Sequence, residues 1–138
     1  MPFEELIAAA GTVLGKRALG KGNDCGSVAS ALCTPDGKVY TGICIDTACG
    51  MGFCAEHAAI AAMLTAGELG EISQIVAINE RGVIPPCGRC REFLVQVSEA
   101  NLATEVMVSE NEVVTLAELL PYRWIPKFTA SVQLIPAG

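Results

Sequence analysis

The sequence predicts an α/β protein, specifically a three-layer α/β/α sandwich with a mixed five-stranded sheet. Strand-like segments alternate with segments of helical periodicity, and such an alternation places helices on both faces of a sheet. The last two strand-like segments are separated only by residues 109–112, which is too short for a crossover and predicts an antiparallel pair. Because no repeat, linker or change in composition divides the chain, we expect residues 1–138 to form one domain.

The N-terminal third predicts one helix followed by a β-hairpin. Apolar residues recur at helical spacing between Phe3 and Leu14, and this pattern predicts an amphipathic helix that ends near Gly20. The segments Ser27–Cys33 and Lys38–Ile45 have strand character. Pro35-Asp36-Gly37 lies between them and supplies turn residues, so the two strands should pair in antiparallel fashion.

The middle of the chain predicts two helices on either side of a strand. The Ala-rich segment Cys54–Ala66, closed by Gly67, predicts a helix that is apolar nearly all round and therefore buried. Residues Ile72–Asn79 predict the strand. Pro86 is well suited to the first position of a helix, which we expect to extend over Cys87–Val97.

The C-terminal part predicts the antiparallel strand pair and then a segment without regular structure. Val106–Val108 and Val113–Thr115 are the two short strands. Residues Ile125–Gly138 contain two prolines and no clear period, and we expect an extended arm there.

Composition and charge narrow the possible functions. With 51% apolar and 17% charged residues, the chain is not of the disordered class. The net charge of −6 would repel a phosphate backbone, so we expect no nucleic-acid partner. No apolar stretch approaches the roughly 20 residues of a membrane-spanning helix, and Met1–Glu5 lacks the character of a signal peptide. We therefore expect a soluble, cytoplasmic protein without a membrane partner.

Three of the seven cysteines have the placement of zinc ligands. In a chain that is not secreted, such a cysteine count favours metal binding or catalysis over disulfides. Cys87 and Cys90 lie three residues apart at a predicted helix start, and Cys54 begins another helix. Three thiolates suit a tetrahedral zinc with bonds of about 2.3 Å and leave a fourth position for water. We expect one zinc per chain, and we expect the other cysteines to be mainly small buried residues: Cys25, Cys33, Cys44 and Cys49.

Glu56 is the candidate catalytic residue. It follows Cys54 by two positions, so its carboxylate can face the open coordination position without being a ligand. A carboxylate in that place can take a proton from zinc-bound water and pass it on, which is general acid–base catalysis.

The two cysteine segments together carry a resemblance to a known family. Cys54-Ala55-Glu56, followed about thirty residues later by Pro86-Cys87-Gly88-Arg89-Cys90, is similar to the established signature of zinc deaminases. The chain resembles the cytidine deaminase superfamily, and within it the blasticidin-S deaminases. The resemblance extends from about Gly26 to Trp124 and includes Asn79–Gly82 and the Leu119-Leu120-Pro121 segment.

This resemblance implies a reaction and roles for site residues. Zinc-activated water attacks C4 of a cytosine ring, Glu56 moves the protons, and ammonia leaves. By the same resemblance, the backbone N–H of Ala55 holds the ring carbonyl oxygen and the carbonyl of Pro85 accepts from the amino group. Trp124 would help to cover the base, although a plain core role for this side chain is the alternative.

Several positions depart from the pattern of typical cytidine deaminases. Cys44-Ile45-Asp46 stands where they have the Asn-x-Glu that grips the sugar, Gly26 replaces a Phe, and His57 replaces a frequent Arg. Cys44 and Asp46 are candidate pocket residues. We expect the substrate to be a free, uncharged cytosine-type nucleoside such as cytidine or deoxycytidine, or an aminopyrimidine analogue such as blasticidin S.

The charge of the site requires compensation. Zinc with three thiolates carries a net charge of −1, which should raise the pKa of the bound water. We expect Arg81 and Arg89 to donate hydrogen bonds to the ligand sulfurs, with His57 as a neighbour of the site. The resemblance to blasticidin-S deaminases points to the same two arginines.

Other interpretations remain open at this point. Cys49 or His57 as a fourth ligand would make a closed zinc site, and the protein would then be a non-catalytic structural zinc-binding interaction module. A redox role for Cys87 and Cys90 is a weaker alternative. A polynucleotide deaminase would need a basic surface that this acidic chain lacks. Related small deaminases assemble as homotetramers, and we expect the same here.

Overall fold

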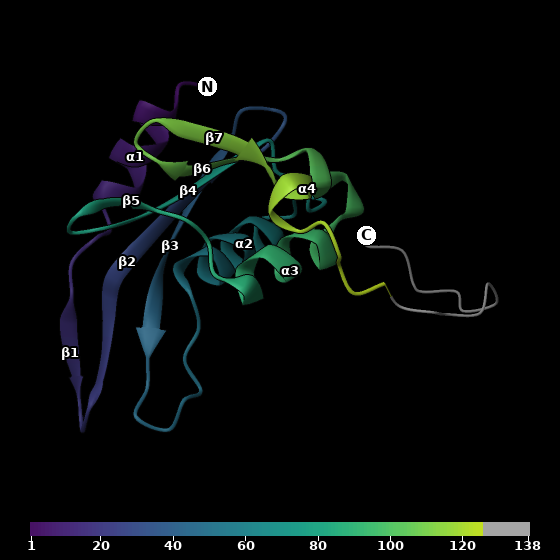
Figure 1. Cartoon of the computed structure of the whole chain (residues 1–138). Helices are drawn as coiled ribbons and strands as arrows, with labels where there is room; N and C mark the ends of the chain where they lie inside the picture. The colour runs from purple at the N-terminus through teal and green to yellow at the C-terminus, as the bar shows by residue number, and fades with distance from the viewer. Residues whose placement is uncertain (126–138) are drawn as a thin grey trace.

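One mixed sheet forms the middle layer of the protein, with helices on both faces (Figure 1). The structure is a computed structural model that describes residues 1–125; the expected arm at 125–138 lies, after its first residue, outside them. The strands follow the order β1-β2-β4-β6-β7, with β3 paired to β2 and β5 paired to β4. Within the described residues the strands are β1 (Arg17–Gly20), β2 (Asn23–Cys33), β3 (Val39–Asp46), β4 (Gln74–Asn79), β5 (Gly82–Ile84), β6 (Glu105–Ser109) and β7 (Glu112–Thr115).

The helices cover the sheet in the way the sequence predicts. Helix α1 packs on one face, and α2 and α3 pack side by side on the other (Figure 1). The three-layer α/β fold is therefore confirmed, as are the antiparallel pairs β2–β3 and β6–β7. The helical segments of the described chain are α1 (Phe3–Gly11), α2 (Ala55–Thr65), α3 (Gly88–Val97), the 3₁₀ helix η1 (Glu99–Ala103) and α4 (Leu116–Leu119).

Alternation along the central strands divides the core into two parts. In β2, Ala29 and Ala31 face α1, whereas Leu32 faces α2 and α3. In β4, Val76 faces α1 and Ile75 faces α2 and α3. A strand with both faces buried needs apolar side chains at nearly every position, and this explains the continuous apolar character of β2 and β4.

The sheet has two more strands than the five expected. β1 is exposed along its whole length and therefore lacks the alternation by which strands are recognised. It pairs with β2 across a tight turn in which Lys21 has a φ of 56° and the Asn23 side chain donates to the Gly20 carbonyl at 3.0 Å. The first helix accordingly ends at Gly11. The other additional strand, β5, has only three residues.

The sequence predicts that helix α2 is buried on all sides, but the structure buries only one side of it. Its inner side contributes Ala59, Ile60 and Met63 to the core. Ala61, Ala62 and Leu64 are exposed, since no other described element covers that side. The cysteines also differ in part from expectation, because Cys25, Cys33 and Cys44 are buried but Cys49 is exposed.

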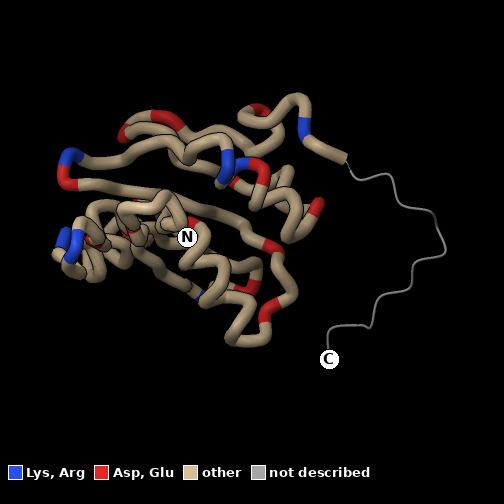
Figure 2. Tube along the Cα trace, turned by 90° about the horizontal axis from the view of Figure 1, so that it is seen from below, with Lys and Arg blue, Asp and Glu red and all other residues tan. Residues whose placement is uncertain are grey.

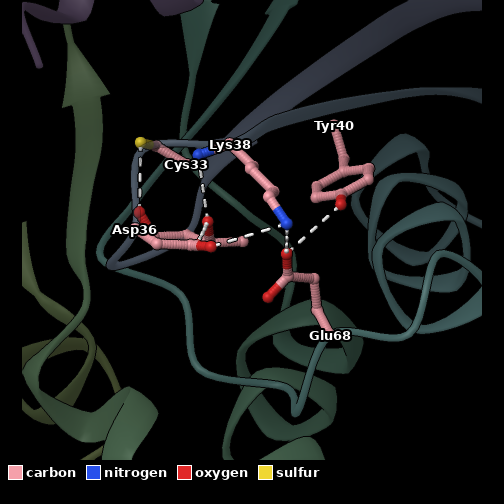
Figure 3. A network of polar contacts seen from close by, with 6 residues as sticks. Cys33, Asp36, Lys38, Tyr40 and Glu68 are labelled. Carbon is pink, nitrogen blue, oxygen red and sulfur yellow. Dashed lines mark hydrogen bonds and ion pairs between the residues drawn. The ribbon is translucent and has the colours of Figure 1, made fainter.

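A polar network on the surface joins the β2–β3 hairpin to the segment that follows α2 (Figure 3). Lys38 Nζ lies 3.3 Å from a Glu68 carboxylate oxygen and 3.6 Å from Asp36 Oδ2. The Tyr40 hydroxyl donates to the same Glu68 oxygen at 3.4 Å. Surface ion pairs of this kind contribute little stability, so the network orients the hairpin more than it stabilises the fold. Elsewhere acidic residues occur on several separate segments of the trace (Figure 2).

No helix of the described chain combines the length and the apolar character needed to cross a membrane.

Asn101 is a buried polar residue whose removal should destabilise the fold. Its Oδ1 accepts from the Ile72 N–H at 2.8 Å, and its Nδ2 donates to the carbonyls of Gly70 and Leu94 at 2.9 and 3.0 Å. Each buried polar group left without a partner costs about 1–3 kcal/mol. We predict that Asn101→Ala lowers the free energy of unfolding by about 3 kcal/mol, measured by urea denaturation. The exposed Asn111→Ala is the control, and equal stability of the two variants would contradict this account.

Gly42 sets the close approach of β3 to α2. A Cβ at this position would collide with the backbone nitrogen of Ala59 and would lie 2.7 Å from the carbonyl oxygen of Ala55. Because these neighbours are backbone atoms, no side-chain rotation relieves the collision. We predict that Gly42→Ala destabilises the protein by about 1–3 kcal/mol, seen as a lower melting temperature. Gly11→Ala, where a Cβ meets open space, should leave it unchanged; a similar drop in both variants would show that close packing at Gly42 is not the cause.

Candidate active site

The candidate site lies where α2 and α3 begin. Cys54 is the residue before the first turn of α2, and Cys87 has the same place before α3. Cys54 Sγ lies 3.4 Å from Cys87 Sγ, and Cys87 Sγ lies 3.6 Å from Cys90 Sγ. Both helices direct their N-terminal ends, with their partial positive charge, at this group of sulfurs, which favours the thiolate forms.

An imidazole completes the set of possible metal donors. One donor atom from each of Cys54, His57 and Cys90 lies within 4.8 Å of the other two, an arrangement that fits a zinc site. His57 Nδ1 is 3.4 Å from Cys90 Sγ, and its ring stacks on Phe93 with ring centres 4.2 Å apart. Sulfur and imidazole nitrogen are the ligands that zinc prefers, so the chemistry of this donor set suits the metal.

Burial controls the protonation of the thiols. It raises the pKa of Cys54 to about 11, and together with the nearby Glu56 carboxylate it raises the pKa of Cys90. At Cys87 burial acts in the same direction, but the backbone N–H of Cys90 and the Cys54 thiol outweigh it and lower the pKa. Thiols held in their neutral form lose their protons when a cation binds, so metal binding here releases protons.

Glu56 lies in the first turn of α2 and is almost fully buried, with 4% of its surface exposed. Burial raises the pKa of its carboxyl group. A shift in this direction makes the carboxyl group a better proton acceptor, which suits a general acid–base.

Cys54, Cys87 and Glu56 open into a cavity of about 300 Å³, whereas Cys90 lies buried behind them. This volume lies at the lower end of the range for small-molecule sites. Most of the residues expected at the site line it, and the lining is formed by Ser27, Val28, Cys44, Asp46, Gly52, Phe53, Cys54, Ala55, Glu56, Ile84, Pro85, Cys87 and Arg89.

Cys44 is a wall residue of this cavity, and its thiol is occupied by protein partners. Its sulfur accepts from the Val28 N–H at 3.3 Å and lies 3.3 Å from the Ser27 hydroxyl. The thiol in turn donates to Asp46 Oδ2 at 3.5 Å. Cys44 therefore positions Ser27, Val28 and Asp46, and its own proton is already engaged.

Arg81 and Arg89 are predicted from the sequence to donate hydrogen bonds to the ligand sulfurs. In the structure they have other surroundings. Arg89 lines the cavity, but its Nη1 donates to the Gly52 carbonyl at 3.1 Å and so fixes the segment before Cys54. Arg81 is exposed in the turn between β4 and β5, and that turn directs it to solvent. Of the side chains described, His57 is the one that brings a nitrogen to a cysteine sulfur of this group.

Trp124 does not cover the cavity. Its N–H donates to Glu92 at 2.9 Å and its carbonyl accepts from Gln96 at 3.1 Å, which holds this segment along α3. The side chain is 63% exposed and lies beside Val95 and Glu99, away from the residues that line the site.

Phe53 and Gly52 are site residues that the sequence analysis missed. Phe53 exchanges two backbone hydrogen bonds with Ile45, at 2.9 and 3.0 Å, and this bridge delivers Cys54 to the start of α2. A Cβ on Gly52 would collide with the Ile45 carbonyl, so glycine is required there. Their location directly before the predicted zinc ligand Cys54 is the sequence feature that could have identified them.

Known proteins share the fold and part of the sequence of this chain. No family model matches the chain. It is 31% identical over 97 residues to a cytidine deaminase of Mycobacterium tuberculosis, covering 69% of this chain and 70% of the relative. A cytidine deaminase of Halalkalibacterium halodurans is 29% identical over 97 residues, covering 68% and 74% of the two chains.

Solved structures give the same result. The cytidine deaminase of Burkholderia pseudomallei superposes with a TM-score of 0.73 at 29% identity, over 90% of this chain and 100% of that one. The Mycobacterium leprae cytidine deaminase gives 0.74 at 27% identity, over 88% and 99%. The chain therefore belongs to the cytidine deaminase family and is an enzyme, a hydrolase that acts on C–N bonds.

Proposed function

We propose that this enzyme hydrolyses the exocyclic amino group of a free cytosine-type nucleoside. Cytidine or deoxycytidine and water would give uridine or deoxyuridine and ammonia, and an aminopyrimidine nucleoside analogue such as blasticidin S is the other candidate substrate. The observation that carries this proposal is a buried carboxyl group, Glu56, in one cavity with the thiols of Cys54 and Cys87 at two helix starts, with the buried Cys90 thiol 3.6 Å from that of Cys87. Membership of the cytidine deaminase family supports it.

The proposed cofactor is one Zn²⁺ per chain, held by Cys54, Cys87 and Cys90. The mutual distances of their sulfurs suit three ligands of one tetrahedral ion. When bound, zinc supplies a Lewis acid that makes water a nucleophile near neutral pH. The positive charge of the bound cation would also offset the negative charge of the thiolates at these helix ends.

The chain's own residues have the remaining tasks. Glu56 takes a proton from the attacking water and delivers it to the departing nitrogen, and its raised pKa suits both steps. The Ala55 N–H at the start of α2 would hold the ring carbonyl oxygen, and the Pro85 carbonyl would accept from the amino group; both residues line the cavity, which supports these roles. Asp46, oriented by Cys44, lies in the wall of the same cavity.

The alternative is a closed zinc site in a non-catalytic structural module, with His57 as the fourth ligand. Its proximity to Cys90 would permit this. We favour a donor role instead, in which the Nδ1–H of His57 donates to the Cys90 sulfur and reduces the charge on the thiolate. The stacked position against Phe93 fixes the ring for that bond, and the open position then belongs to the cavity that contains Glu56.

We further propose that residues 1–138 form one domain that assembles as a cytoplasmic homotetramer. Support comes from apolar surface on and beside α2, where Leu64 and Leu69 are 42% and 83% exposed. Met51, 78% exposed, lies in the segment that leads to the site. Large apolar side chains with this exposure are available for subunit contacts.

Glu56→Gln tests the proton transfer directly. The amide keeps the shape of the side chain but cannot move a proton, so we predict that kcat falls by about 10³-fold while zinc remains bound. Turnover is followed by the change in absorbance on conversion of cytosine to uracil, and zinc by elemental analysis. Full turnover in this variant would show that another group carries the proton.

His57→Ala tests the donor role. Loss of a hydrogen bond to a ligand sulfur should speed the release of zinc to a chelator by about 10–100-fold, with one zinc still bound per chain at saturation. His57→Asn should restore part of the wild-type rate, because its amide can donate from nearly the position of Nδ1. Loss of stoichiometric zinc binding in both variants would instead identify His57 as a ligand.

A panel of substrates tests the proposed class. Cytosine, cytidine, deoxycytidine, 5-methylcytidine, blasticidin S and CMP would be compared by kcat/KM. We expect an uncharged nucleoside or blasticidin S to exceed CMP by at least about tenfold, because the net charge of −6 and the Asp46 carboxylate repel a phosphate. Faster turnover of CMP than of every nucleoside would overturn the claim.

A further inference from the structure

A second cavity adjoins the candidate active site. It has a volume of about 450 Å³ and shares two wall residues, Ser27 and Val28, with the cavity that contains Glu56. Both residues are held in place from the other side by the Cys44 sulfur. Ser27 and Val28 are therefore the residues at which the two cavities meet.

The floor of the second cavity is built by two glycines. Gly26 has a φ of +85°, and its carbonyl accepts from the Gly15 N–H at 2.9 Å. A Cβ on Gly26 would collide with the carbonyl oxygen of Gly15. The segment after α1 can thus pack directly against β2, and this packing brings Lys16 to the cavity wall.

Two charges of opposite sign face this cavity. Lys16 lines it from the segment after α1, and Glu80 lines it from the turn that follows β4. Within residues 1–125 neither side chain forms an ion pair; the pairs present there involve Lys38 and Arg123. One cation and one carboxylate are therefore both available to a ligand.

We propose that this second cavity binds an amino-acid group, carrying both an ammonium and a carboxylate, attached to the sugar of the substrate nucleoside. The inference rests on the proposed function, because the base must occupy the first cavity. Lys16 would pair with the carboxylate of the group and Glu80 with its ammonium. A zwitterion has no net charge and so avoids the repulsion that a phosphate meets at a protein of net charge −6.

Two synthetic nucleosides test this proposal. One is cytidine with homocysteine joined through its sulfur to the 5′ carbon, and the other carries a butyl thioether in the same place. We expect the wild-type enzyme to deaminate the homocysteine compound with a kcat/KM about tenfold above that of the butyl compound, and to lose part of this preference at high salt. Equal values for the two compounds would overturn the proposal.

Four variants test whether the second cavity causes the preference for the homocysteine compound. Lys16→Gln and Glu80→Gln should each bring the ratio of the two kcat/KM values close to one, whereas the exposed Lys21→Gln and Glu112→Gln should keep it. A ratio that persists in both cavity variants would also overturn the proposal.

Turnover of cytidine itself distinguishes a failure of this proposal from a failure of the proposed function. If wild-type enzyme with zinc deaminates no cytosine compound, the proposed function fails. Calorimetric binding of the two compounds to Glu56→Gln then decides the second cavity: tighter binding of the homocysteine compound that is lost on Lys16→Gln supports it, and equal binding contradicts it.

Discussion

The meeting of two helix starts is the constraint on which the rest of the structure depends. Helices α2 and α3 lie on the same face of the sheet, and their first turns bring Cys54, Cys87 and Cys90 within a few ångströms. This requires α2 to lie close against β3, which the bare backbone of Gly42 allows. It also requires the Ile45–Phe53 bridge that fixes where α2 begins. The contacts that stabilise the middle layer therefore also set the geometry of the site.

Charge is the second consideration, because three thiols and a buried carboxyl group share one small volume. Burial raises the pKa of Glu56 and of two of the thiols, Cys54 and Cys90. A bound cation stabilises the thiolates, and the helix N-termini act in the same direction. The arginines nearby are engaged with backbone carbonyls, Arg89 with Gly52 and Arg91 with Pro86 and Leu119. They stabilise the loops around the site, while His57 faces the sulfur.

Local patterns explain which features could be predicted from the sequence. The turn at Pro35–Gly37, the helix starts at Cys54 and Cys87, and the short connection before β7 each lie within a few residues, and all were predicted correctly. The short exposed strand β1 leaves no alternation to detect. The positions of Arg89 and Trp124 depend on contacts with residues about thirty positions away, Gly52 and Glu92, which no local pattern encodes.

X-ray absorption at the zinc edge is the most direct measurement of the central claim, an open zinc site beside a buried carboxyl group. We predict three sulfur ligands at about 2.3 Å and one oxygen at about 2.0 Å, without the scattering features of a coordinated imidazole. The spectrum should be the same for wild type and for His57→Ala loaded with zinc. A fourth protein ligand, seen as an imidazole signal that disappears in His57→Ala, would contradict the account and would show a closed structural site.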